Sequence, residues 1–343
     1  MGNLNIPYFS SKTQEKNTQI EKKKKDIEEE IGKEKLKCIC ILNEHNKWIN
    51  CLINIKPNHF ASCSGDRSIK IFSGDQKDNF KCLLKIDNCH YDYILFITQL
   101  NNNNLVSCST DSTIKIWEIN IEKLNYKLLI ILNKHEGDVW KVLELNKTLN
   151  LVSCSSDKTI KIWKENKEKK TYDIIKEING YKLWIESILE IITNDNINYL
   201  VSGGGDLNIK FYDINKNFNF IFQFENVLVV HQMSFIQLDQ FRICAGGTGN
   251  GFFTVINFRN FQREINVKIH SNDIYAMLLL KNGKIITSGK DQKLKISNRI
   301  TYKKEIVVKN IHDSYVYAIA QLNNKFIATC SDDKKIKVWE IVN

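Results

Sequence analysis

Short apolar segments separated by polar turns recur along the chain from about residue 36 to its end. One example covers residues 126–164, where the apolar segments are YKLLIIL, VWKVLEL, NLVSCSS and TIKIWK. Each is rich in β-branched or aromatic residues, and clusters of Asn, Gly, Asp or Lys separate them. This pattern predicts four β-strands per unit. Several segments are apolar almost throughout, which indicates that both faces of these strands are covered.

The four-strand unit occurs seven times, at a spacing of about 40 to 50 residues. One marker is a turn aspartate, replaced once by Asn, at Asp66, Asp111, Asp157, Asp206, Asn250, Asp291 and Asp333. A second marker lies upstream, at His45, His90, His135, Tyr181, His270 and His312, with His231 near this position in the fifth unit. Single cores rarely grow beyond about 250 to 300 residues, so this chain of 343 residues is predicted to be a repeat array.

Three stretches carry the clearest form of the repeat: SCSTDSTIKIW at 107–117, SCSSDKTIKIW at 153–163 and TCSDDKKIKVW at 329–339. They resemble the blades of WD-repeat (WD40) propeller proteins. The resemblance implies an all-β, seven-bladed β-propeller over residues 36–343, after a charged tail at 1–35. It is weakest in the fifth and sixth units, because the tryptophan position of the seven units holds Phe72, Trp117, Trp163, Tyr212, Ile256, Ser297 and Trp339.

The resemblance further implies a buried hydrogen-bond chain in each complete repeat. Its members would be a loop histidine, a strand serine or threonine, a turn aspartate and a tryptophan, and their donor and acceptor capacities fit such a chain. Three quartets are complete: His90, Ser107, Asp111 and Trp117; His135, Ser153, Asp157 and Trp163; His312, Thr329, Asp333 and Trp339.

A hydrolase triad is the competing interpretation of these residue types. Such a triad needs one exposed nucleophile, one base and an oxyanion hole around a single cavity, whereas this constellation recurs around a ring. The sequence contains no GxSxG, HExxH or glycine-rich phosphate loop. We therefore expect no catalytic residues, no enzymatic activity and no small-molecule substrate.

Closure of the ring is predicted from its two ends. The last unit has only three predicted strands, at about 315–322, 325–330 and 336–341, and an unassigned strand, LKCICIL at 36–42, precedes the first histidine. Pairing of strand 36–42 with the last blade would remove an exposed edge and join the two ends.

In the family, the loops that enter each blade share one face with the turns between the second and third strands, and this face commonly holds partners. Three residues after the histidine position lie Trp48, Tyr93, Asp138, Trp184, Asp273 and Tyr315, and just before the turn aspartates lie Thr110, Lys290 and Asp332. Aromatic residues are enriched in protein interfaces, so we predict a partner-binding face there. Two residues further on lie three more aromatic residues, Trp140, Tyr275 and Tyr317. Each of them could either pack against its neighbours or contact a partner.

The formal net charge of +10 would by itself favour nucleic acid or an anionic membrane as a partner. The chain contains little Arg, however, and its lysines are spread over every repeat rather than gathered on one element. Neither nucleic acid nor a membrane is therefore an expected partner.

Four of the ten cysteines, Cys63, Cys108, Cys154 and Cys330, occupy one position of the repeat and are expected to be small buried residues. Cys38 and Cys40 fall on opposite faces of a predicted strand, so we expect no metal site and no cofactor.

The start, MGNLNIPYFSSK, lacks the apolar core of a secretory signal, and no apolar run reaches the roughly 20 residues of a membrane span. The expected location is the cytoplasm or the nucleus.

The tail is strongly charged over residues 13–37. Opposite charges four residues apart favour a short helical extension, and they occur at Glu21 with Lys25 and at Glu29 with Lys33. Ile20, Ile27 and Ile31 form one narrow stripe, which leaves both a solvated helix and a coiled coil open. Gly2 is placed for acylation, but Ile6 stands where that motif has Ser or Thr, so no membrane anchor is expected.

These features predict a non-enzymatic interaction scaffold or adaptor, a monomeric propeller that binds proteins or peptides within a complex. A narrower alternative is a signalling subunit resembling G-protein beta chains, whose plan is a helical extension before seven blades. A ubiquitin-ligase substrate receptor is a further alternative. It lacks the WDxR box of some family members, because the blade ends here are WEIN, WKEN, YDIN and WEIV.

Overall fold

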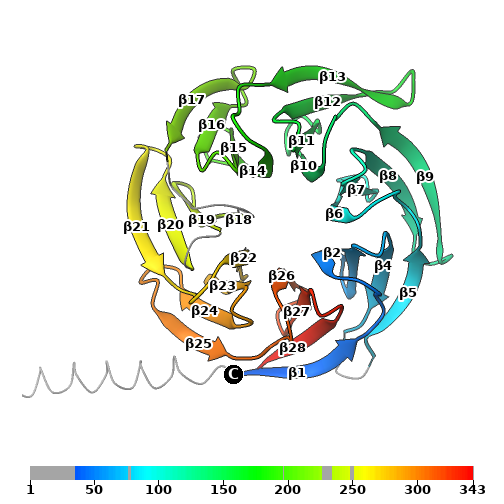
Figure 1. The fold of residues 1–343 in the computed structure, drawn as a ribbon, viewed down its shortest axis with the longest axis vertical. Helices are drawn as coiled ribbons and strands as arrows, with labels where there is room; N and C mark the ends of the chain where they lie inside the picture. Colours follow the sequence, from blue (N-terminus) through cyan, green and yellow to red (C-terminus); the bar gives the residue numbers. More distant parts are fainter. Residues whose placement is uncertain (1–34, 76–78, 196, 226–233, 248–250, 343) are drawn as a thin grey trace, which may run out of the picture.

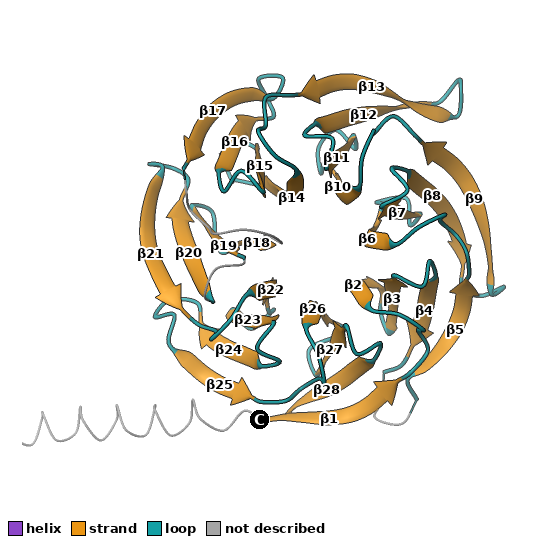
Figure 2. Ribbon diagram, in the orientation of Figure 1, coloured by secondary structure: helices purple, strands orange, loops and turns teal. Residues whose placement is uncertain are grey.

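Seven antiparallel sheets of four strands each are arranged as blades around a central axis (Figure 1). The structure is a computed structural model, and it describes residues 35–75, 79–195, 197–225, 234–247 and 251–342. Within these ranges every regular element is a strand (Figure 2), and none is a helix that could cross a bilayer. The predicted all-β, seven-bladed propeller is confirmed. The predicted helical extension over residues 1–34 lies outside the described residues.

Each blade runs from an inner strand beside the axis to an outer strand at the rim (Figure 1). Blade 1 contains β2 (Ile49–Lys56), β3 (His59–Ser64), β4 (Ile69–Ser73) and β5 (Lys81–Ile86). Blade 2 contains β6 (Ile94–Gln99), β7 (Leu105–Ser109), β8 (Ile114–Asn120) and β9 (Asn125–Leu132). Blade 3 contains β10 (Val139–Glu144), β11 (Leu151–Ser155), β12 (Ile160–Asn166) and β13 (Thr171–Ile178).

The remaining blades follow the same order. Blade 4 contains β14 (Ile185–Ile191), β15 (Tyr199–Gly204), β16 (Ile209–Asp213) and β17 (Asn219–Phe224). Blade 5 contains β18 (Ser234–Gln237), β19 (Arg242–Gly246), β20 (Phe252–Asn257) and β21 (Gln262–Lys268), and blade 6 contains β22 (Ile274–Leu279), β23 (Lys284–Gly289), β24 (Leu294–Asn298) and β25 (Lys304–Val308). Blade 7 contains β26 (Val316–Gln321), β27 (Phe326–Ser331), β28 (Ile336–Val342) and, at its rim, β1 (Lys35–Leu42).

The core lies between neighbouring blades, which explains the nearly continuous apolar strands. Every residue of β7 and β11 is buried. Val106 and Ile116 of blade 2 share one apolar cluster with Val139 and Leu151 of blade 3. The repeated cysteine position faces this packing, and Cys63, Cys108, Cys154 and Cys330 are all fully buried free thiols. Each sheet therefore buries both faces only because a blade stands on either side of it.

The sequence unit is offset from the blade by one strand. The segment YKLLIIL, which begins a unit in the sequence, forms most of β9, and β9 pairs antiparallel with β8 at the rim of the preceding blade. The chain then returns to the axis and starts β10 of the next blade. Each unit thus connects the rim of one blade to the inner strand of the next, so neighbouring blades are tied covalently as well as by packing.

The ring is closed by strands from both ends of the chain. β1 pairs antiparallel with β28, from Lys35 opposite Val342 to Leu42 opposite Ile336, with a register shift between Cys38 and Cys40. Leu42, Ile336 and Phe326 pack in one apolar cluster with Ile49 of blade 1. The first and last blades are therefore joined by a shared core as well as by a shared sheet.

Removal of the closing strand should destabilise the whole ring. We expect a chain truncated to begin at residue 43 to melt roughly 10 °C or more below one truncated to begin at residue 31, because it loses the β1 ladder and the burial of Leu42. Thermal unfolding followed by circular dichroism measures the difference. Equal melting temperatures of the two truncated chains would contradict this closure.

Candidate functional site

The three predicted quartets are hydrogen-bonded chains in blades 2, 3 and 7. In blade 2, His90 Nδ1 lies 2.9 Å from Asp111 Oδ2, His90 Nε2 lies 2.7 Å from Ser107 Oγ, and Trp117 Nε1 donates to Ser107 Oγ at 2.9 Å. The corresponding distances are 2.6, 2.7 and 2.8 Å for His135, Ser153, Asp157 and Trp163 of blade 3. They are 2.9, 2.8 and 2.9 Å for His312, Thr329, Asp333 and Trp339 of blade 7.

The donor order within a quartet follows from the chemistry of its ends. An indole N–H only donates and a carboxylate only accepts, so the hydroxyl donates to His Nε2 and the imidazole donates from Nδ1 to the aspartate. The carboxylate receives further donors: Asp111 accepts from the backbone N–H groups of Tyr91 and Thr113 at 3.0 Å each and from the Thr113 hydroxyl at 2.6 Å. The aspartate thereby fastens the loop before the inner strand to the turn between the second and third strands.

Burial and pairing shift the titration of these groups. Burial lowers the pKa of His45, His90 and His270 although the paired aspartate opposes it, which keeps these imidazoles neutral. Burial alone would raise the pKa of the turn aspartates, but the histidine and the other donors outweigh it. The pKa of Asp333 is about 2, and those of Asp66, Asp111, Asp157 and Asp291 also lie below their usual range.

Further blades carry variants of this chain that the tryptophan position did not indicate. His45 bridges Asp66 and Ser62 at 2.9 and 2.7 Å in blade 1, although Phe72 replaces the tryptophan. His270 bridges Asp291 and Thr287 at 2.8 Å each in blade 6, although Ser297 replaces the tryptophan there. In blade 4, the Tyr181 hydroxyl bonds Ser202 at 2.5 Å and Tyr212 at 2.7 Å. The fifth-unit markers His231 and Asn250 lie outside the described residues.

The quartets leave no nucleophile open to a substrate. Ser107, Ser153 and Thr329 have no exposed surface, and each hydroxyl already bonds its histidine and its tryptophan. A serine hydrolase needs an accessible hydroxyl beside a substrate cavity. Among the described residues, no group of three or more His, Cys, Asp or Glu is placed to hold a metal ion. The described quartets therefore have the geometry of structural ties.

The six predicted face residues after the histidine position occupy equivalent places around the ring. Each directly precedes the fully buried first residue of an inner strand, and its carbonyl accepts one backbone hydrogen bond of 2.9 or 3.0 Å from the nearby turn. The six bonds join Trp48 to Gly65, Tyr93 to Thr110, Asp138 to Ser156, Trp184 to Gly205, Asp273 to Lys290 and Tyr315 to Asp332. Thr110, Lys290 and Asp332, predicted from the turns, thus lie beside the loop residues, and all nine side chains are half-buried.

Two tryptophans of this face lie against glycines. A Cβ atom at Gly65 would come within 2.6 Å of the Trp48 ring, and one at Gly205 within 2.5 Å of the Trp184 ring. The Trp48 ring also contacts Tyr93 edge to face, with centroids 4.8 Å apart, and the Lys47 ammonium lies 4.9 Å from the Tyr93 centroid. The glycines therefore let both indoles lie flat and half-exposed in fixed positions.

The part of the face on blades 6 and 7 combines charge with tyrosine. Lys290 lies 3.9 Å from the Asp273 carboxylate and 5.3 Å from the Tyr315 centroid. The Tyr315 and Tyr275 rings are 6.0 Å apart, and Asp332 accepts from the Ser314 hydroxyl at 2.8 Å. In blade 3, burial and the charge of nearby Asp92 raise the pKa of Asp138.

Trp140, Tyr275 and Tyr317, for which packing and partner contact were both open, all line a cavity on the ring axis. The Trp140 indole donates to Ser156 Oγ at 2.7 Å, and the Tyr275 and Tyr317 rings lie 5.4 Å apart. They are half-buried, so they both pack against neighbours and face the cavity.

Comparison with known proteins agrees with the repeat pattern. The family model "WD domain, G-beta repeat" matches residues 36–73, 80–118, 126–164 and 304–340, which include the three stretches that carry the clearest form of the repeat. The WD40 β-propeller domain of Doa1 is similar in structure, with a TM-score of 0.73 over 89% of this chain and 97% of that chain, at 16% sequence identity. At this identity the likeness shows the fold alone. No curated protein matches the chain.

Loss of one quartet hydroxyl should cost stability. Ser153→Ala leaves the buried His135 and Trp163 nitrogen atoms without their shared partner, so we expect the free energy of unfolding to fall by about 2 to 4 kcal/mol. Ser297→Ala is the matched control, because the equally buried Ser297 hydroxyl makes no hydrogen bond to the described residues. It should change stability by less than about 0.5 kcal/mol. Urea unfolding measures both, and equal losses would refute a special role for the quartet.

The shifted pKa values also predict an acid-sensitive fold. The folded pKa of His45, His90 and His270 lies below the unfolded value of about 6.5, so their contribution is present above that pH and is lost as the pH falls. The turn aspartates add a second loss below about pH 4, their unfolded pKa. Urea unfolding from pH 8 to pH 3 should show a plateau followed by a decline, and a maximum below pH 5 would contradict this.

Proposed function

We propose that this chain, a seven-bladed β-propeller in which four segments match WD40 repeats, acts as a non-enzymatic scaffold that holds a protein or peptide on one face of the ring. Propellers of this kind typically serve in protein interaction. The working surface would be the docking face, defined here by Trp48, Tyr93, Asp138, Trp184, Asp273 and Tyr315 and by the turn residues Thr110, Lys290 and Asp332.

The observation that carries this proposal is the equivalent, fixed placement of the six loop residues. The backbone carbonyl of each accepts one hydrogen bond from its turn, and four of the six residues are tryptophan or tyrosine. Aromatic side chains that are already held in place lose little conformational entropy when a partner binds. Such residues are also the commonest carriers of binding energy in interfaces. The docking face therefore has both the composition and the rigidity of a binding surface.

The charges on the docking face favour a partner with a mixed, polar contact surface. The Lys47 ammonium lies beside the Trp48 and Tyr93 rings. Asp92 and Asp138, in the loops that enter blades 2 and 3, form a neighbouring acidic patch. The sign of the charge thus changes around the ring. A partner that matches this alternation gains orientation as well as affinity.

The narrower alternatives differ in where the partner binds. A role like that of G-protein beta chains depends on the N-terminal tail, whose residues 1–34 lie outside the described part. Recovery of the same partners by residues 35–343 alone would favour the general scaffold over that role. A ubiquitin-ligase receptor role has no support in the blade ends, which lack the WDxR box.

Loss of two aromatic anchors should remove a specific set of partners. We expect Trp48→Ala with Trp184→Ala to reduce the recovery of docking-face partners by more than about tenfold in proximity labelling, because the variant removes two large aromatic rings that are held in fixed positions on the docking face. The matched control is Tyr126→Ala with Phe220→Ala, which removes two aromatic residues exposed by 44% and 55% on outer strands β9 and β17. Melting curves of both variants test whether they are folded.

The two double variants separate the docking face from the rim. An unchanged partner set in the Trp48 and Trp184 variant would refute the proposed face. An equal loss in the Tyr126 and Phe220 variant would place the contact at the rim instead.

A further inference from the structure

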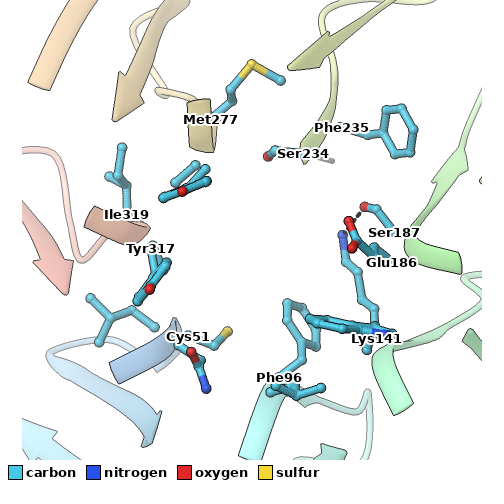
Figure 3. A pocket seen from close by; sticks show the side chains of 17 residues that line it. Cys51, Phe96, Lys141, Glu186, Ser187, Ser234, Phe235, Met277, Tyr317 and Ile319 are labelled. Atoms are coloured by element: carbon cyan, nitrogen blue, oxygen red, sulfur yellow. Dashed lines mark hydrogen bonds between the residues drawn. The ribbon is translucent and has the colours of Figure 1, made fainter. Parts of the chain in front are cut away.

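The inner strands of all seven blades enclose one cavity of about 260 Å³ on the ring axis, which we call the channel cavity (Figure 3). Much of its wall is apolar and aromatic, with Phe96, Trp140, Phe235, Met277 and Tyr317 among the lining residues. A volume of this size suits a small organic group rather than a folded element. The aromatic wall offers such a group a large apolar contact.

One cation stands in this wall. Of the described residues that line the channel cavity, Lys141 of β10 alone carries a positive charge. Its ammonium lies 3.5 Å from Ser187 Oγ and 5.4 Å from the Phe96 centroid, and Figure 3 shows it directed toward Ser187. No described carboxylate oxygen comes within ion-pair distance of Lys141. Burial lowers the pKa of Lys141, which reflects a charge held among neutral neighbours.

The one carboxylate of the described wall, Glu186, is engaged elsewhere. Glu186 is only 6% exposed, and its Oε1 accepts the Trp184 indole N–H at 2.7 Å. Lys141 keeps more of its surface open than Glu186 does. A buried charge without a counter-ion is costly, and an anion that reaches it gains a strong, charge-assisted hydrogen bond.

We propose that the channel cavity binds a small aromatic or aliphatic carboxylate, whose carboxylate group lies at Lys141 and Ser187 and whose apolar part packs on the aromatic wall. The lysine supplies the charge, the serine hydroxyl supplies a second donor, and Phe96 and Trp140 supply apolar contact. This site lies inside the ring, and its ligand does not depend on the proposed function of the docking face.

Two kinds of ligand carry such a carboxylate group: a free small acid, and a peptide that ends in an apolar residue with a free C-terminal carboxylate. Both place the same group at Lys141, so the experiment compares them directly.

The test measures the binding of 3-phenylpropionate and of its neutral amide to the full chain, by calorimetry and by ligand-observed NMR. We expect the acid to bind at least about tenfold more tightly than the amide, because only the acid forms the charge-assisted bond. Lys141→Met should weaken the acid by a similar factor. Lys164→Met is the matched control, since Lys164 is exposed on β12 of the same blade, and it should leave acid binding unchanged.

The variant Glu186→Gln tests whether the channel cavity binds an anion or a cation. The amide oxygen keeps the acceptor for Trp184 while a negative charge disappears from the wall, so the acid should bind as tightly as before or more tightly. Tight binding of a cation such as 2-phenylethylamine that is lost in this variant would overturn the proposal.

Other results would overturn it as well. Equal binding of acid and amide, no saturable binding of the acid at millimolar concentration, or unchanged binding in Lys141→Met would each refute the carboxylate site. If Lys141→Met does not fold, the comparison of acid and amide on the unmodified chain still decides. A short peptide ending in phenylalanine, compared with its C-terminal amide and with 3-phenylpropionate, identifies which of the two sources binds more tightly.

Discussion

A buried aspartate at a strand turn is the constraint on which the ring and its surface depend. The charge of Asp111, removed from water, is stable only if several donors reach it, and these come from His90, from Thr113 and from the backbone of the entering loop. Once the loop is fixed at Tyr91, the residue two places later, Tyr93, directly precedes the inner strand β6 and is held in place through its backbone carbonyl. The tie that stabilises the blade therefore also positions a side chain of the docking face.

The ring tolerates unequal blades because packing between sheets carries much of its stability. Blade 4 replaces the histidine chain with hydroxyl bonds from Tyr181, and blade 6 keeps His270 although Ser297 stands in place of tryptophan. Both blades still bury apolar clusters against their neighbours. With the framework constant, the residue after each loop is free to vary between tryptophan, tyrosine and aspartate, and in the proposed function this variation would set the specificity of the docking face.

The sequence predicted what repeats locally, and it missed what depends on the ring as a whole. Strand positions, the three quartets and the docking-face positions follow a regular spacing in the chain, whereas the chains at His45 and His270 were hidden because the tryptophan position is substituted there. The lysine of the IKIW motif looks like a solvent charge, yet Lys115 is buried and donates to the Cys89 carbonyl at 2.8 Å. The position of Lys141 in the cavity wall could not be recognised from the sequence, because the residues around it come from strands of several blades.

The docking face and the channel cavity meet on strand β14. Trp184 precedes this strand and belongs to the face, while Glu186 and Ser187 are its second and third residues and line the cavity. The bond from the Trp184 indole to the Glu186 carboxylate links the two directly, and Ser187 is the hydroxyl nearest the Lys141 ammonium. Trp48 has no such described link to the cavity wall. Both tryptophans are half-exposed aromatic residues of the proposed face, but among the described contacts of these two side chains the bond to Glu186 belongs to Trp184 and joins the surface of the propeller to the charges at its centre.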